Sequence, residues 1–138
     1  MANSTTLYTL PDGRRAVDVT ENKTLAITDQ GIVQVVKTDA IVVTLPATVV
    51  GYSFTVYNGG AKITSGAPDG ARGDGSILLA LSPNSADLIA GGQITAADDK
   101  DYLNTKATSR VGDEVTVVGN GTTGWNITHQ KGIWAREA

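Results

Sequence analysis

Short segments in which apolar and polar residues alternate run along most of the chain. The alternation is strict from Ser53 to Val56, and Ile41–Leu45 is almost entirely apolar until Pro46, which cannot donate a hydrogen bond to a neighbouring strand. Further strands are expected at residues 5–10, 14–20, 25–27, 32–37, 76–81, 86–92, 114–118, 125–128 and 132–136. About ten short strands separated by Gly and Asp predict an all-β fold, either a small barrel or a sandwich-like domain.

Turn residues indicate which strands are joined as hairpins. Pro11-Asp12-Gly13 separates the first two strands, because proline presets the backbone of a turn and glycine accepts a positive φ. Asp29-Gln30-Gly31 predicts a second hairpin, and Asn58-Gly59 is a strong hairpin signal after the alternating strand. A turn at Gly119-Asn120-Gly121 separates the two clearest strands of the C-terminal third.

Two segments do not fit the strand pattern. Residues Ser65–Gly75 are rich in Gly and Asp without periodicity, which predicts a long exposed loop that includes Arg72, Gly73 and Asp74. Residues Thr95–Leu103 are the only candidate for a helical turn, capped by Thr95. No repeat of 20 to 50 residues is evident, which argues against a solenoid or a propeller.

The length of 138 residues corresponds to one domain. We expect an N-terminal arm and hairpin at residues 1–22 and a single β domain at residues 23–138. Val, Ile and Thr together supply 41 residues, whereas Leu, Ile, Val and Phe supply only 33. Such a composition favours strands but predicts a thin core, so apolar surface is expected to be shared with neighbouring copies of the chain.

Charge and cysteine content exclude several classes of function. The net charge is −3, and among the 11 Lys and Arg residues only Arg14 and Arg15 are adjacent, which argues against a nucleic-acid-binding stripe or a polybasic membrane patch. The chain has no cysteine, so disulfides, thiolate catalysis and zinc–thiolate sites are excluded. Neither a signal peptide nor a membrane-spanning run is evident, which predicts synthesis in the cytoplasm.

Candidate chemical groups each have an ordinary structural interpretation. His129 is the only histidine and lacks a recognisable nucleophile, so a surface strand or loop position is favoured over catalysis. Asp98-Asp99-Lys100-Asp101 lacks the ligand spacing of a calcium loop, and a solvated turn is favoured. Arg72-Gly73-Asp74 matches the integrin-recognition tripeptide, but three residues are weak evidence.

The two tryptophans could stack on sugar rings, but both lie inside strand patterns, where packing is favoured. We expect Phe54, Val56, Trp125 and Trp134 to pack in the core or between copies. No phosphate-binding loop, catalytic carboxylate pair or nucleophile elbow is present in the sequence. The sequence therefore predicts neither an enzyme nor a cofactor or metal site.

Six motifs occur in a characteristic order between residues 38 and 138. They read IVVTLPA, GYSFTVYNGG, SPNSADLIAGG, VGDEVTV, GNGTTGWNI and GIWARE. Together they resemble small β-rich structural proteins of tailed bacteriophages, of the capsid decoration (cement) and head-fibre type.

The resemblance implies a virion component on the capsid exterior, commonly a homotrimer, that bridges major capsid proteins without catalysis. It also implies that a terminal arm or the base of the trimer contacts the capsid. On this basis the capsid contacts are expected at Asn3, Thr5, Leu7, Tyr8, Leu10, Arg14 and Arg15. The alternative is a fibre or tail module in which the loop at residues 65–75 and the two tryptophans bind host-surface glycans. Neither nucleic acid nor membrane is an expected partner.

Overall fold

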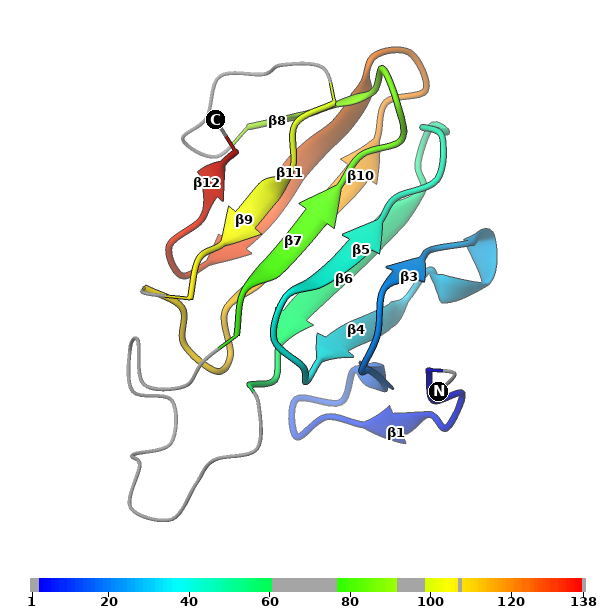
Figure 1. Cartoon of the computed structure of the whole chain (residues 1–138). Helices are drawn as coiled ribbons and strands as arrows, with labels where there is room; N and C mark the ends of the chain where they lie inside the picture. The colour runs from blue at the N-terminus through cyan, green and yellow to red at the C-terminus, as the bar shows by residue number, and fades with distance from the viewer. Residues whose placement is uncertain (1–2, 61–76, 92–98, 107, 138) are drawn as a thin grey trace.

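The computed structural model describes residues 3–60, 77–91, 99–106 and 108–137, and within them the fold is all-β (Figure 1). Two mixed sheets pack against each other as a sandwich. The seven-stranded sheet has the order β1 (Tyr8–Thr9), β2 (Arg15–Val19), β4 (Ile32–Val36), β6 (Ser53–Asn58), β10 (Glu114–Gly119), β11 (Gly124–Lys131) and β8 (Leu88–Ala90). The five-stranded sheet has the order β12 (Ala135–Arg136), β9 (Tyr102–Asn104), β7 (Leu79–Ser82), β5 (Ile41–Thr44) and β3 (Lys23–Thr24). The predicted sandwich-like class is confirmed.

From β2 to β7, successive strands alternate between the two sheets. Strands β2, β4 and β6 are parallel in one sheet, and β3, β5 and β7 are parallel in the other, so the chain winds as in a short β-solenoid. The sequence did not reveal this winding, because its coils differ in length. Arg15 lies opposite Ile32, 17 residues later, whereas Ile41 lies opposite Leu79, 38 residues later.

Two predicted hairpins are wrong. Strand β3 pairs in parallel with β5, and Ile27–Asp29 forms a 3-10 turn, so the chain crosses between sheets instead of reversing at Asp29–Gly31. Strand β6 is likewise not paired with β7, which lies in the other sheet. The Asn58 side chain instead accepts a hydrogen bond from the N–H of Gly60 and donates one to Asn104.

The predicted helical turn is wrong at its C-terminal end. Tyr102 and Leu103 belong to β9, which pairs with β7 and β12. The start of that segment at Thr95 lies outside the described residues, as do Arg72, Gly73 and Asp74 of the predicted loop.

The remaining hairpins agree with the turn chemistry. Strands β1 and β2 are antiparallel on either side of the turn that contains Gly13, whose φ is +92°. Strands β10 and β11 are antiparallel around Asn120, whose Oδ1 accepts hydrogen bonds from three following backbone N–H groups. That side chain holds the turn closed.

The core between the sheets is complete within one chain. Trp125, Phe54 and Val56 are at most 2% exposed, and the rings of Phe54 and Trp125 are 5.5 Å apart. Trp134 is 7% exposed and stacks on Tyr102 with ring centroids 5.4 Å apart. These four expected packing residues therefore lie inside the single chain and do not offer their side chains to a neighbouring copy.

Candidate interaction surface

The N-terminal segment is fastened to the sandwich by Asn3. Its side-chain carbonyl accepts hydrogen bonds from the N–H groups of Thr20 and Glu21 at 2.8 and 3.0 Å, and its amide donates to the Glu21 carbonyl at 3.1 Å. Three hydrogen bonds from one side chain fix the start of the segment beside the end of β2.

A second attachment is apolar. Ala16, Val33 and Val35 form a small buried cluster separate from the main core, and Leu10 and Tyr57 pack against it. These side chains lie on the outer face of the seven-stranded sheet, since their neighbours Val36 and Val56 point into the core. The tip of the first hairpin thus folds over that face.

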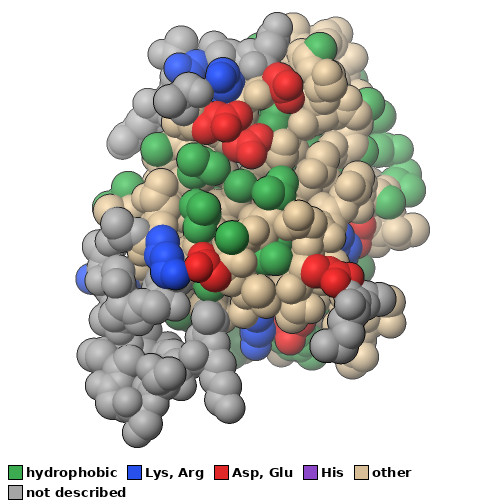
Figure 2. Space-filling model, in the orientation of Figure 1, with side chains coloured by type: hydrophobic (Ala, Val, Ile, Leu, Met, Phe, Trp, Pro, Cys, Tyr) green, Lys and Arg blue, Asp and Glu red, His purple; other side chains and the backbone are tan. Residues whose placement is uncertain are grey.

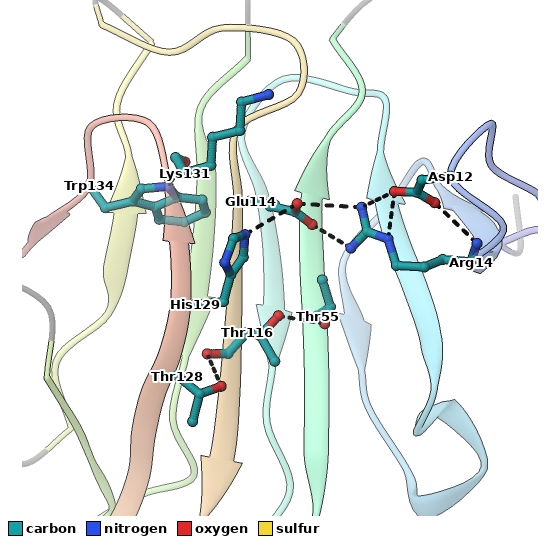
Figure 3. A network of polar contacts seen from close by, with 9 residues as sticks. All are labelled: Asp12, Arg14, Thr55, Glu114, Thr116, Thr128, His129, Lys131 and Trp134. Carbon is teal, nitrogen blue, oxygen red and sulfur yellow. Dashed lines mark hydrogen bonds and ion pairs between the residues drawn. The ribbon is translucent and has the colours of Figure 1, made fainter.

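The third attachment is an ion pair that spans the sheet (Figure 3). Arg14 contacts Glu114 through both terminal nitrogens, at 2.7 and 3.4 Å, and also pairs with Asp12 at 2.8 Å. Nε2 of His129 lies 3.4 Å from the other side of the Glu114 carboxylate. The hydrogen bond to Glu114 is the main cause that raises the pKa of Arg14, so the guanidinium stays charged.

Hydroxyl groups extend this network along β10. Thr55 and Thr116 share a hydrogen bond of 2.8 Å between β6 and β10, and the Thr128 hydroxyl donates to the Thr116 carbonyl at 3.4 Å. Nearby, the Trp134 indole N–H donates to the Lys131 carbonyl at 2.9 Å. Polar side chains therefore line the outer face along β10 and β11, and Glu114 joins this part of the face to the hairpin (Figure 3).

The expected contact residues divide into two groups. Asn3, Leu10 and Arg14 are used within the chain, as described above. Thr5, Leu7, Tyr8 and Arg15 are exposed, with 38% of Leu7 and 36% of Tyr8 accessible. The Tyr8 hydroxyl donates to Asp18 at 2.5 Å, and burial together with this bond raises the pKa of Tyr8. The first group therefore anchors the hairpin to the sandwich, and the hairpin carries the exposed residues at the edge of the sheet.

Sequence reasoning missed Glu114, Tyr57 and Asn104. Glu114 accepts a hydrogen bond from Arg14, which lies 100 positions away in the chain, and no local sequence pattern indicates such a contact. Asn104 is fully buried and donates to Asp113 at 3.0 Å. The one available signal was for Asn104, a polar residue at a strand position that points inward.

The structure places the histidine, the tryptophans and part of the acidic turn. His129 lies in β11 with 57% of its side chain exposed, as expected for a surface strand residue. Trp125 and Trp134 are buried, as the favoured packing interpretation expects, so neither presents a ring face for the sugar stacking of the alternative interpretation. Of the acidic turn, Asp98 lies outside the described residues, whereas Asp101 pairs through its backbone with Glu137.

A further surface is the outer face of the five-stranded sheet. The register places Val42, Ala80, Leu103 and Ala135 in one row across four strands. Figure 2 shows hydrophobic side chains gathered over β5, β7 and β9, with charged side chains towards the ends of the strands. We call these four residues the apolar row.

The described residues also lack a metal-binding cluster and a membrane-spanning helix. Within the described ranges, no three His, Asp or Glu side chains are grouped as metal ligands would be. In the same part of the chain, no helix has the length and apolar character needed to span a membrane.

The fold defines the chain as an all-β protein of two mixed sheets with a fastened N-terminal hairpin. Comparison with protein-family models, with curated proteins and with solved structures found no match.

Proposed function

We propose that the chain is a structural protein of a tailed-phage virion, a homotrimeric capsid decoration protein that bridges and stabilises major capsid proteins on the outside of the head. The main support for the proposal is that the first hairpin is fixed to the sheet while part of it stays exposed. Its tip is held on the sheet by Leu10 and Arg14, while Tyr8 on the edge strand β1 and Leu7 just before it remain exposed. An edge strand with exposed apolar side chains is suited to contact another protein.

The order of sequence motifs supports the capsid as the partner. The apolar row supports assembly with further copies, because an apolar sheet face packs well against another such face. In a cyclic assembly each contact is repeated in every subunit, and many weak contacts then give firm attachment to the shell. The mechanism is mechanical: the bound trimer holds adjacent capsid subunits together against the pressure of the packaged DNA.

The test uses phage particles that lack this protein, to which the purified chain is added back. The unaltered chain should sediment with the particles and restore their resistance to heat. Leu7→Ser should lower the bound amount at least threefold, because it removes an apolar contact of about 1–2 kcal/mol. Ile133→Ser is the matched control, since Ile133 is also exposed, at 49%, but lies away from the hairpin. Equal binding of both variants would contradict the role of the hairpin, and absence of binding by the unaltered chain would contradict the function.

A further inference from the structure

A lysine, a glutamine and an aspartate meet at the end of the sandwich where the winding begins. Nζ of Lys23 on β3 lies 2.7 Å from Oε1 of Gln34 on β4 and 3.2 Å from Oδ1 of Asp29. Strands β3 and β4 belong to different sheets, so the amine and the carboxamide face each other across the core. None of these three residues is an expected contact residue, although Thr5 and Leu7 line the concavity beside Lys23 and Asp29.

The carboxamide end of this contact is dry. Gln34 is fully buried, and its cross-strand neighbours Val17 and Val56 are 3% and 1% exposed. The side chains of Lys23 and Asp29 are partly buried, at 18% and 16% exposed. A partly buried amine, a buried carboxamide and a nearby carboxylate together supply the nucleophile, the acyl group and the proton carrier of an amide exchange between side chains.

The positions of the reacting atoms are restrained. The carbon of the carboxamide is bonded to Oε1 at about 1.23 Å, so it lies no more than about 3.9 Å from Nζ, close to the separation of a reactive encounter. The other carboxamide atom, Nε2, donates to the Ile32 carbonyl at 3.1 Å, which fixes the amide plane. The second oxygen of Asp29 accepts the N–H of Ala26 at 2.8 Å, which fixes the carboxylate.

We propose that Lys23 and Gln34 form an intramolecular isopeptide bond, with Asp29 as the catalytic proton carrier. Asp29 takes a proton from Nζ, and the nitrogen lone pair attacks Cδ of Gln34. Nζ then gives up a second proton, both protons pass to Nε2 with Asp29 as the carrier, and the bond between Cδ and Nε2 breaks so that Nε2 leaves as ammonium. One C–N bond forms and one breaks, no oxidant or further reactant is needed, and the chain loses one ammonia.

The local shape suits this step. A concavity of about 250 Å³ adjoins Lys23 and Asp29 and opens to the surface beneath residues 4–7, so ammonia can leave. The dry carboxamide is protected from competing hydrolysis, because water is excluded from its carbon. The product would bind β3 covalently to β4 and close the first coil of the winding.

The test is the intact mass of the purified full chain under denaturing conditions. The bond lowers the mass by about 17 Da, one ammonia, and trypsin no longer cleaves after Lys23, because its amine is acylated. Residues 16–37 should then appear as one peptide that contains an internal link between positions 23 and 34. A chain with the full sequence mass, cleaved normally after Lys23, would overturn the proposal.

Variants separate the reaction from other losses of ammonia. Lys23→Met should restore the full mass for its sequence, and Asp29→Asn should slow the loss at least tenfold. Lys37→Met is the matched control and should keep the bond, because Lys37 pairs with Asp18 and touches no carboxamide. Succinimide formation at Asn120-Gly121 also releases ammonia; a loss that persists in Lys23→Met and maps to that peptide would refute the bond.

Folding is checked separately by circular dichroism. If Lys23→Met does not fold, the tryptic map of the unaltered chain decides alone. The outcome is independent of capsid binding, since a chain without the bond could still decorate a shell and a chain with the bond could fail to do so.

Discussion

At the scale of single residues, the adjacent Arg14 and Arg15 have different structural roles. Arg14 is held by Asp12 and Glu114, whereas Arg15 is exposed and has no ion pair within the described residues. The Arg14 side chain is 38% exposed, so solvent screening limits the value of its ion pairs to about 1 kcal/mol. Its contribution is therefore to hold the hairpin tip in place, with a modest effect on overall stability.

Replacement of these arginines tests that difference. The N–H groups of Leu10 and Gly13 close the turn through hydrogen bonds of 2.8 Å to the carbonyls of Arg14 and Leu10. Arg14→Met should accelerate hydrogen exchange at both groups by about fivefold, which corresponds to a loss of about 1 kcal/mol in the free energy of opening the turn. Arg15→Met is the control and should leave both rates unchanged. Equal rates in the two variants would show that the ion pair does not fasten the hairpin.

Asp101 gives a prediction for pH. Burial raises its pKa above the ordinary 3.8, and the charges of Glu137 and Asp99 add to the effect, while a hydrogen bond from Ser82 opposes it. A raised pKa in the folded state means that protonated Asp101 stabilises the fold below pH 3.8 and that this contribution is lost as the pH rises through the folded-state value. At neutral pH the charged carboxylate is therefore a net cost.

Asp101→Asn should accordingly raise the melting temperature at neutral pH, and the gain should vanish below pH 3.8. Asp12→Asn provides a control of opposite sign, because the backbone N–H and guanidinium of Arg14 lower the pKa of Asp12. That variant should melt earlier at neutral pH. Thermal unfolding followed by circular dichroism measures both, and a lower melting temperature for Asp101→Asn at neutral pH would contradict the assignment.

At the scale of elements, β11 packs on β8 at Gly124 with no room for a side chain. Gly124 has a φ of +151°, and a Cβ there would overlap the carbonyl oxygen of Leu88. Gly124→Ala should therefore lower the free energy of unfolding by about 3 kcal/mol or more. Gly13→Ala is the control: Gly13 also has a positive φ, but open space surrounds it, so the loss should be about 1 kcal/mol. Denaturant unfolding that gives equal losses would contradict the described packing.

The strands themselves were largely predictable, but their connections were not. Alternation from Ser53 to Val56 and the Gly119–Gly121 turn are local signals, and both have the expected structure. The partner of a strand is decided by contacts far along the chain, so Asp29–Gly31 looked like a hairpin turn although β3 pairs with β5. Of the candidate surface, the sequence indicated the hairpin but not Glu114, which is contributed by a distant strand.

At the scale of the whole molecule, the completed core alters the argument for assembly. The composition suggested a thin core that neighbouring copies would complete, yet Phe54, Trp125 and Trp134 are buried within one chain. The support for assembly therefore rests on the outer surface, in particular on the apolar row. The proposed trimer would therefore add contacts between subunits whose cores are already formed.

The solution mass tests this assembly. Light scattering should give about 43 kDa, three times the chain mass of 14.3 kDa. Leu103→Glu should shift the mass to that of a single chain, because it places a charge in the middle of the apolar row. Ile133→Glu, at an exposed position outside the row, should remain trimeric. A trimer that tolerates Leu103→Glu would show that the copies meet elsewhere.

If the chain decorates the outside of a phage capsid, cryo-electron microscopy of particles made with and without this protein should reveal it. We expect difference density on the outer surface at three-fold positions, fitted by three copies of the sandwich with their N-terminal hairpins towards the shell. Identical capsid surfaces in the two preparations would contradict it.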